Sequence, residues 1–147
     1  MGVDCIVPVH TTHGVVKIQP DRVEHQRARW QKIALEAAQQ SERRTIPTIA
    51  EPTDLSRLFA SHSSATMKTI LSERTGETSL TALPLPIGPE QSIIVLIGPE
   101  GGWEREELRL AQEQGYRALT LGARILRAET AAIAAISVLQ SRLGELG

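Results

Sequence analysis

The clearest hydrophobic pattern lies in the last third of the chain. Residues 93–97 form an unbroken apolar run rich in β-branched side chains, which is typical of a parallel strand covered on both faces. The pattern then predicts a helix over 104–114, a strand over 116–121 and a helix over 129–143. This alternation predicts an α/β fold with a mainly parallel sheet flanked by helices.

Shorter patterns fill the first two thirds. They predict strands at 3–9, 15–18, 46–50 and 65–71. They also predict a helix over 21–40, capped by Asp21, with an apolar stripe of Val23, Trp30, Ile33, Ala34 and Ala37. A short helix begun by Pro52, Thr53 and Asp54 is expected to bury Leu55, Leu58 and Phe59. Glycines and prolines break the pattern over 72–91, so we expect a surface loop there.

Composition limits the class of protein. A chain of 147 residues suits one domain, over 1–147, and its net charge of -1 argues against wholesale electrostatic binding to nucleic acid. The single cysteine, Cys5, excludes an internal disulfide framework and fits a reducing compartment; we expect it to be an inert core thiol. No signal peptide or apolar run long enough to cross a membrane is present, which predicts a cytoplasmic protein. The four histidines are scattered, so no metal is expected.

A glycine-rich segment, residues 98–102, follows the strand predicted at 93–97. No lysine follows these glycines, so the segment is not a P-loop. The next helix opens with Glu104, Glu106 and Glu107, which would repel a bound phosphate. A neutral or cationic ligand, such as an adenosine that carries a sulfonium, fits better. The alternative that the segment is only a tight turn stays open.

Charged residues frame a second loop, after the strand predicted at 116–121. Arg124, Arg127 and Glu129 flank Ile125 and Leu126, an apolar pair that we expect to anchor the loop in the core. The arginines would then face a cleft or a partner, where they can stabilise an anion. The alternative is an arginine–glutamate pair that only fixes the start of the last helix. That helix is apolar nearly all round over 130–139, which predicts burial in the core and allows packing against a second subunit.

Two motifs in these loops resemble a known family. They are Ile-Gly-Pro-Glu-Gly-Gly-Trp at 97–103, followed by Glu107, and Leu-Gly-Ala-Arg-Ile-Leu-Arg-Ala-Glu-Thr-Ala at 121–131. Together with Gly-Val-Asp-Cys-Ile-Val-Pro-Val at 2–9, they closely resemble the bacterial 16S ribosomal RNA uridine N-3 methyltransferases of the SPOUT superfamily. The resemblance covers essentially the whole chain.

The resemblance implies a SPOUT-type methyltransferase domain with a C-terminal trefoil knot, acting as a homodimer with S-adenosylmethionine as cofactor. It also implies that the cofactor is held by Leu96, Ile97, Gly98, Pro99, Glu100, Gly101, Gly102, Leu121, Gly122, Ile125, Leu126 and Ala128. The family has in addition an N-terminal PUA-like RNA-binding domain and a first strand and helix. The chain is expected to lack these parts.

The expected activity is therefore methylation of a uridine N-3 in 16S ribosomal RNA of the small ribosomal subunit. Arg127 and Glu129 are the catalytic candidates: Arg127 to stabilise charge on the uracil oxygens, and Glu129 to take the imide proton or to orient Arg127. Arg124, Arg29 and Lys32 are candidates for RNA binding. Two alternatives stay open: a catalytically weak cofactor- or RNA-binding remnant, or a SPOUT methyltransferase with another RNA target.

Overall fold

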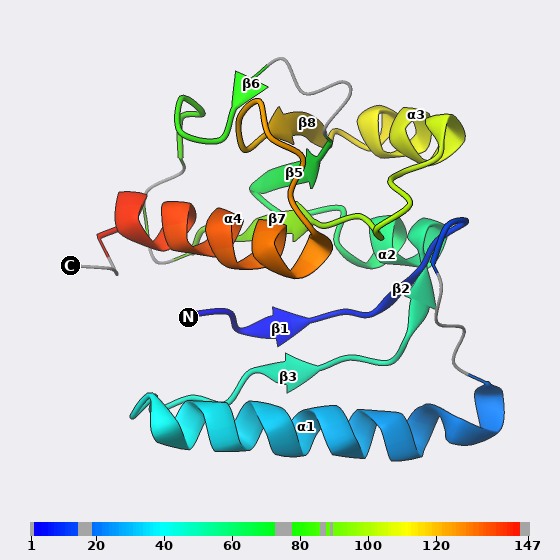
Figure 1. Cartoon of the computed structure of the whole chain (residues 1–147), viewed down its shortest axis with the longest axis vertical. Coiled ribbons are helices and arrows are strands. Elements are labelled where there is room, and N and C mark those ends of the chain that lie inside the picture. Colours follow the sequence, from blue (N-terminus) through cyan, green and yellow to red (C-terminus); the bar gives the residue numbers. More distant parts are fainter. Residues whose placement is uncertain (1, 15–18, 73–77, 86–87, 89, 145–147) are drawn as a thin grey trace.

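The computed structural model describes residues 2–14, 19–72, 78–85, 88 and 90–144 (Figure 1). In chain order the strands are β1 (Cys5–Ile6), β2 (Val9–His10), β3 (Thr48–Ile49), β4 (Thr53–Asp54), β5 (Met67–Leu71), β6 (Thr78–Ser79), β7 (Ile93–Leu96) and β8 (Arg117–Thr120). The helices are a 3₁₀ turn, η1 (Pro20–Arg22), and α1 (Val23–Gln40), α2 (Leu55–Ser61), α3 (Arg105–Glu113) and α4 (Ala128–Arg142). The predicted α/β class is confirmed. The strand predicted at 15–18 lies outside the described residues.

The central sheet has four parallel strands in the order β6-β8-β5-β7. The last strand in sequence, β8, therefore lies between β5 and β6. All the carboxyl ends point to one edge of the sheet, because every pairing is parallel. The loops that follow β7 and β8 consequently begin at the same edge, although more than twenty residues separate them along the chain.

The two faces of this sheet carry separate cores, because alternate residues of a strand point to opposite faces. On one face Ile70 packs with residues of α2 and α3 in the cluster Leu55, Leu58, Phe59, Ile70, Leu96, Ala111 and Tyr116. On the other face Leu71 packs with α4 in the cluster Met67, Leu71, Leu80, Leu83, Leu119, Ala135 and Leu139. The predicted burial of Leu55, Leu58 and Phe59 is confirmed, and Asp54 caps α2 by accepting a hydrogen bond from Arg57 N at 2.8 Å.

The expectation of a surface loop over 72–91 is wrong in part. Leu80 is fully buried, Leu83 is 3% exposed, and β6 pairs with β8 within this stretch. The two leucines fill the core between β8 and α4. The local sequence shows only the glycines and prolines that break a regular pattern. The burial of Leu80 and Leu83 depends instead on β8 and α4, which come much later in the chain.

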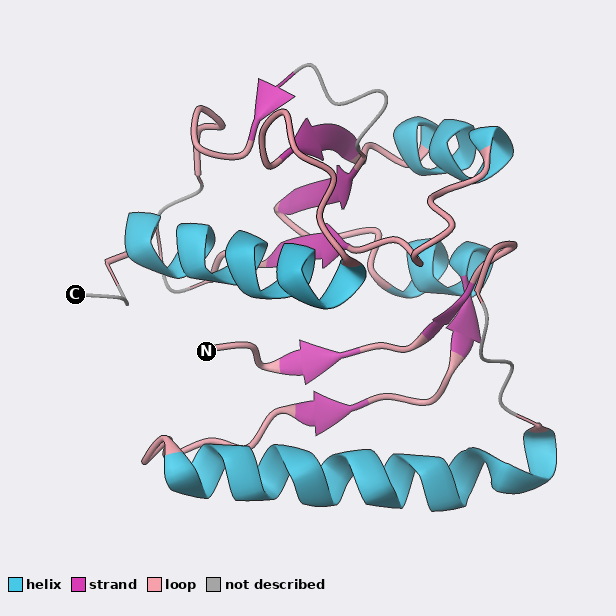
Figure 2. Cartoon of the chain, viewed as in Figure 1, coloured by secondary structure: helices cyan, strands magenta, loops and turns pink. Residues whose placement is uncertain are grey.

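The N-terminal part forms two small parallel pairs, β1 with β3 and β2 with β4. Figure 2 shows β1 and β3 between α1 and α4. The strand predicted at 3–9 is divided around Pro8, which has no N–H to donate to a ladder. Cys5 is exposed, so the expectation of a core thiol is wrong.

Helix α1 also departs from its prediction. It begins one residue later than expected, with Arg22 rather than Asp21 at the N-cap and no side-chain capping bond. Ala34 and Ala38 are buried, whereas Ile33 is 53% exposed. The described part of the chain contains no helix that is both long and apolar enough to cross a membrane.

Candidate ligand site at the ends of the parallel strands

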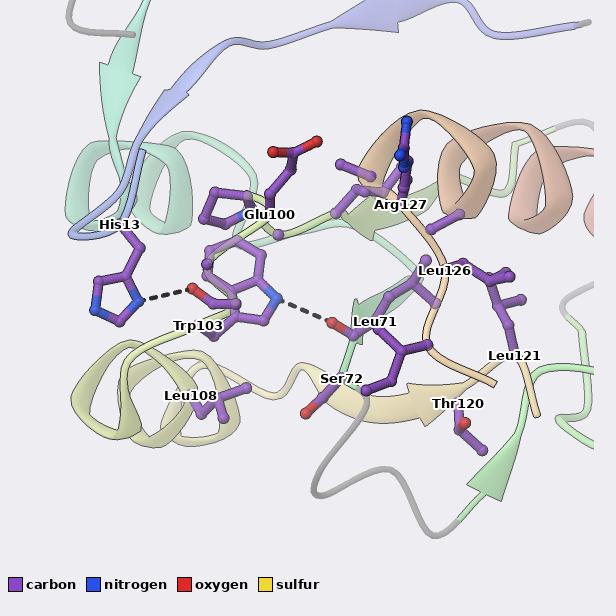
Figure 3. Close-up of a pocket in the computed structure, with 18 of the residues that line it drawn as sticks. His13, Leu71, Ser72, Glu100, Trp103, Leu108, Thr120, Leu121, Leu126 and Arg127 are labelled. Carbon is purple, nitrogen blue, oxygen red and sulfur yellow. Dashed lines mark hydrogen bonds between the residues drawn. The ribbon is translucent and has the colours of Figure 1, made fainter. Parts of the chain in front are cut away.

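A cavity of about 710 Å³ opens at the carboxyl edge of the central sheet (Figure 3). Its walls come from the end of β5, the loop after β7, the loop after β8 and the first turns of α3 and α4. Of the residues predicted to hold a ligand, those that line it are Ile97, Gly98, Pro99, Glu100, Gly101, Gly102, Leu121, Gly122, Ile125, Leu126 and Ala128. Leu96 does not line the cavity; it is buried in the core beneath it.

The first loop, residues 97–104, is fixed to the sheet by an indole. Trp103 donates a hydrogen bond from Nε1 to the carbonyl oxygen of Leu71 at 2.9 Å, at the end of the neighbouring strand β5. A Cβ atom on Gly98 would lie 2.9 Å from the same Nε1, so only glycine lets the chain pass this close to the ring. Gly102 closes the turn with a positive φ of 74° and donates to the carbonyl of Pro99 at 2.8 Å. The Trp103 hydrogen bond, the close approach at Gly98 and the turn at Gly102 therefore fix the conformation of this loop.

The N-terminus of α3 is occupied by a carboxylate of its own chain. Glu107 is 8% exposed and accepts hydrogen bonds from Glu104 N at 2.9 Å and Thr12 N at 2.8 Å. Thr12 Oγ1 also donates to it, at 3.2 Å. A negative charge already satisfies this helix end, so the geometry agrees with the interpretation that the glycine loop is not a phosphate cradle.

A threonine sets the shape of the second loop, residues 121–127. Thr120 Oγ1 donates to the carbonyl of Gly122 at 2.9 Å and accepts from Gly122 N at 3.1 Å, with Gly122 at a φ of 121°. Ile125 is 79% exposed, so the expectation that it anchors this loop in the core is wrong. It lines the open cavity instead, beside Leu126.

The predicted catalytic and RNA-binding residues lie in different places. Arg127 and Arg124 line the cavity, with Arg127 exposed at the N-cap of α4. Glu129 lies in the first turn of α4 and does not line the cavity. The side chains of Arg127 and Glu129 make no hydrogen bond or ion pair with any residue that the structure describes, so a side-chain pair that fixes the helix start is not formed. Arg29 and Lys32 are exposed on α1, away from the cavity.

The cavity also includes residues that the motifs did not indicate, among them His13, Leu71, Ser72, Leu108 and Thr120. Leu71 ends a predicted strand and Thr120 lies one residue before the end of another, and that position is the signal that could have found them. His13 comes from a loop almost ninety residues earlier in the chain. No local pattern connects it to the cavity.

Among the residues that the structure describes, the groups with displaced pKa values lie outside this cavity. Burial raises the pKa of the Tyr116 hydroxyl, which packs in the core against Phe59. A hydrogen bond from Arg109 lowers the pKa of the Glu106 carboxyl on the exposed side of α3. Within the described residues no group of three or more histidine, cysteine, aspartate or glutamate side chains is placed to hold a metal ion.

The chain belongs to the RNA methyltransferase domain family, whose model matches residues 1–140. Among its relatives is the Ribosomal RNA small subunit methyltransferase E of Mesomycoplasma hyopneumoniae, 38% identical over 133 residues that make up 90% of this chain and 56% of the relative. The predicted resemblance is thereby confirmed. The chain spans a little over half the length of the curated relatives it matches.

Solved structures of the same class share the fold. A methyltransferase from Legionella pneumophila, solved with bound S-adenosylmethionine, has a TM-score of 0.85 and 36% identity, with 96% of this chain and 56% of that one covered. Ribosomal RNA small subunit methyltransferase E from Neisseria gonorrhoeae, also bound to S-adenosylmethionine, has a TM-score of 0.84 and 35% identity over the same shares, 96% and 56%.

Trp103 provides a test of how the first loop is held. Trp103→Phe keeps an aromatic ring but leaves the Leu71 carbonyl without its donor, which we expect to lower the free energy of unfolding by about 1–3 kcal/mol. Trp30→Phe is the matched control, because no hydrogen bond of the Trp30 indole is found among the described residues. Urea unfolding of both variants measures the difference. Equal losses would show that the Trp103 bond does not stabilise the loop.

Proposed function

We propose that this chain binds S-adenosylmethionine in the cavity and transfers its methyl group to N-3 of a uridine in 16S ribosomal RNA of the small ribosomal subunit. One observation carries the proposal: both motif loops, 97–103 and 121–128, meet around one cavity. Similar chains from Legionella and Neisseria were solved with this cofactor bound, and relatives are named for the small-subunit RNA. Such a substrate places the activity in the cytoplasm.

The walls of the cavity suit this cofactor. A volume of about 710 Å³ lies in the range of small-molecule sites, roughly 300–1,000 Å³. Ile97, Leu121 and Leu126 supply apolar surface for an adenosine, and the glycines expose backbone groups for its polar edges. The carboxylate of Glu107 at the start of α3 disfavours a nucleotide polyphosphate and tolerates a sulfonium.

The chemistry requires a negative charge to form on the uracil. When bound, S-adenosylmethionine supplies an electrophilic methyl group, and transfer to N-3 leaves the electron pair of the broken bond on sulfur. The imide proton of N-3 must leave, which places negative charge on the uracil oxygens. Arg127, exposed at the cavity and without a partner among the described residues, is available to stabilise that charge. Glu129, two residues further along α4, is the candidate to accept the proton or to orient Arg127.

The proposed RNA contacts follow from where the basic residues lie relative to the cavity. Arg124 lines the same cavity as Arg127, so it can bind a phosphate next to the target base. Arg29 and Lys32 lie on the exposed face of α1 and would bind RNA further away. Lys32 is also within 4.0 Å of Glu36, an exposed pair that costs little to break.

We also infer that the C-terminal part is a trefoil knot. Its support is that β8 lies between β5 and β6, and that the loops after β7 and β8 meet at one cavity. A crystal structure in which the path of the chain contains no knot would contradict this inference.

A homodimer through α4 is the proposed assembly. The helix buries Ala135 and Leu139 in its own subunit and leaves Ile133 56% exposed. An apolar side chain this exposed on an alanine-rich helix is suited to an interface.

Glycine variants test the cofactor site. Gly102 and Gly115 both have a positive φ, 74° and 83°, and no atom lies within 4 Å of a Cβ placed on either. Valine should strain the backbone equally at the two positions, by about 1–2 kcal/mol. Because only Gly102 lines the cavity, we expect Gly102→Val alone to abolish binding of S-adenosylmethionine in calorimetric titration. Wild-type protein that does not bind the cofactor, or equal affinity in both variants, would contradict the assignment.

Variants of Arg127 and Glu129 should affect methyl transfer without affecting cofactor binding. Arg127→Ala and Glu129→Gln are expected to keep cofactor affinity and to lose methyl transfer by about a hundredfold or more, because they act on charge formed in the transition state. Arg117→Ala, exposed on β8 outside the cavity, is the control. The assay follows labelled methyl groups into small ribosomal subunits from cells that lack the modification. Cofactor binding without transfer in the wild type would instead favour a catalytically weak remnant.

The dimer is tested on the exposed side of α4. Ile133→Glu should give a folded monomer in sedimentation velocity, because the interface would have to bury an unpaired charge. Leu143→Glu, near the end of the same helix, is the control and should leave the dimer intact. A wild-type monomer at micromolar concentration would disprove this assembly. Ala135 is not suitable for this test, since it is fully buried within its own subunit.

A further inference from the structure

The turn at residues 11–14 contacts the glycine loop at the edge of the cavity, where Figure 3 shows His13 beside the loop. His13 Nε2 lies 2.9 Å from Glu104 Oε1, and His13 Nδ1 lies 3.2 Å from the carbonyl oxygen of Gly102. A Cβ atom on Gly101 would lie only 2.8 Å from the Cβ of His13. One side chain therefore contacts three successive parts of the loop.

The two partners of this imidazole determine its protonation. A backbone carbonyl and a carboxylate can only accept hydrogen bonds, so both ring nitrogens have to donate. A neutral imidazole has a single N–H, and only the imidazolium has two. The contacts made by His13 are thus complete only when it carries a positive charge.

We propose that His13, as an imidazolium, is a positioning residue that holds the Gly101–Gly102 segment in its ligand-binding shape. This inference rests on the proposed function, since it concerns the loop assigned to the cofactor. His13 Nδ1 contacts the carbonyl of Gly102, and Nε2 contacts the carboxylate of Glu104, the N-cap residue of α3. Releasing both contacts removes the support for the Gly102 carbonyl, and binding then has to order that part of the loop again.

The carboxylates that face residues 11–14 are those of Glu104, which pairs with His13, and Glu107, which accepts from Thr12. The other charged residues that line the cavity are Glu100, Arg105, Arg124 and Arg127. Histidine loses its charge between about pH 5 and pH 8. Because both contacts together need a ring with two N–H groups, the proposal predicts that they weaken when the imidazolium loses a proton.

The experiment is calorimetric titration of the wild type, His13→Ala and His10→Ala with S-adenosylmethionine at about pH 6 and about pH 7.5. The His13 and Glu104 side chains are 40% and 44% exposed. The contact of such a pair corresponds to at most about a fivefold change in affinity. We expect wild type and His10→Ala to bind about fivefold more tightly than His13→Ala at the lower pH and to approach it at the higher pH. Any effect of pH on the ionisation of S-adenosylmethionine is the same for all the proteins, because their affinities are compared with one another at the same pH.

Two further variants make the outcome specific. His13→Arg carries a permanent charge and several donors, so it should retain affinity at both pH values. Glu104→Gln keeps an acceptor but removes the charge, so it should reduce the difference between the two pH values. Cofactor binding by the wild type with no effect of His13→Ala at either pH would overturn this inference alone. A wild type that does not bind would overturn the proposed function as well.

Discussion

The position of β8 is the constraint on which the rest of the structure depends. β8 follows β5, β6 and β7 in the sequence, yet it pairs with β5 and β6 inside the sheet. This insertion brings the ends of β7 and β8 to one edge, on either side of β5. The two loops thus form opposite walls of one cavity, which adjacent strands joined by short turns would not produce.

The loops hold their shape through contacts that cross the sheet. Trp103 extends from the loop after β7 to a carbonyl at the end of β5. Glu107 joins the start of α3 to Thr12, in a turn that follows β2. The second bond connects the N-terminal part of the chain to α3 beside the cavity, so Thr12 and His13 contribute to the site although they lie in neither motif. A binding site made this way is preorganised, and less ordering remains to be done when a ligand binds.

Much of the fold could be predicted from the sequence, because the last third is encoded locally. The apolar run at β7, the helix α3 and the glycine loop between them need no distant partner to be recognised. The rest depended on long-range packing: Leu80 and Leu83 are buried by α4, and His13 reaches the cavity across almost ninety residues. Ile125 shows the opposite error, since apolar character suggested an anchor where the structure has an exposed wall. The cofactor and the substrate came from family resemblance and not from any periodicity.

The distribution of charge around the cavity is compatible with the two partners proposed for it. The inner walls are apolar and glycine-rich, and the carboxylate of Glu107 already neutralises the helix end beside them. A ligand with little net charge can be desolvated there at low cost. Arg124 and Arg127 instead lie on the exposed loop and helix start, where an RNA phosphate or a charged uracil would arrive from solvent. In the proposed arrangement, these arginines would attract the RNA polyanion, while the apolar walls would hold the sulfonium cofactor. The glycine loop forms part of the apolar wall, so the cavity keeps its shape through the contacts that His13, Trp103 and Glu107 make with this loop.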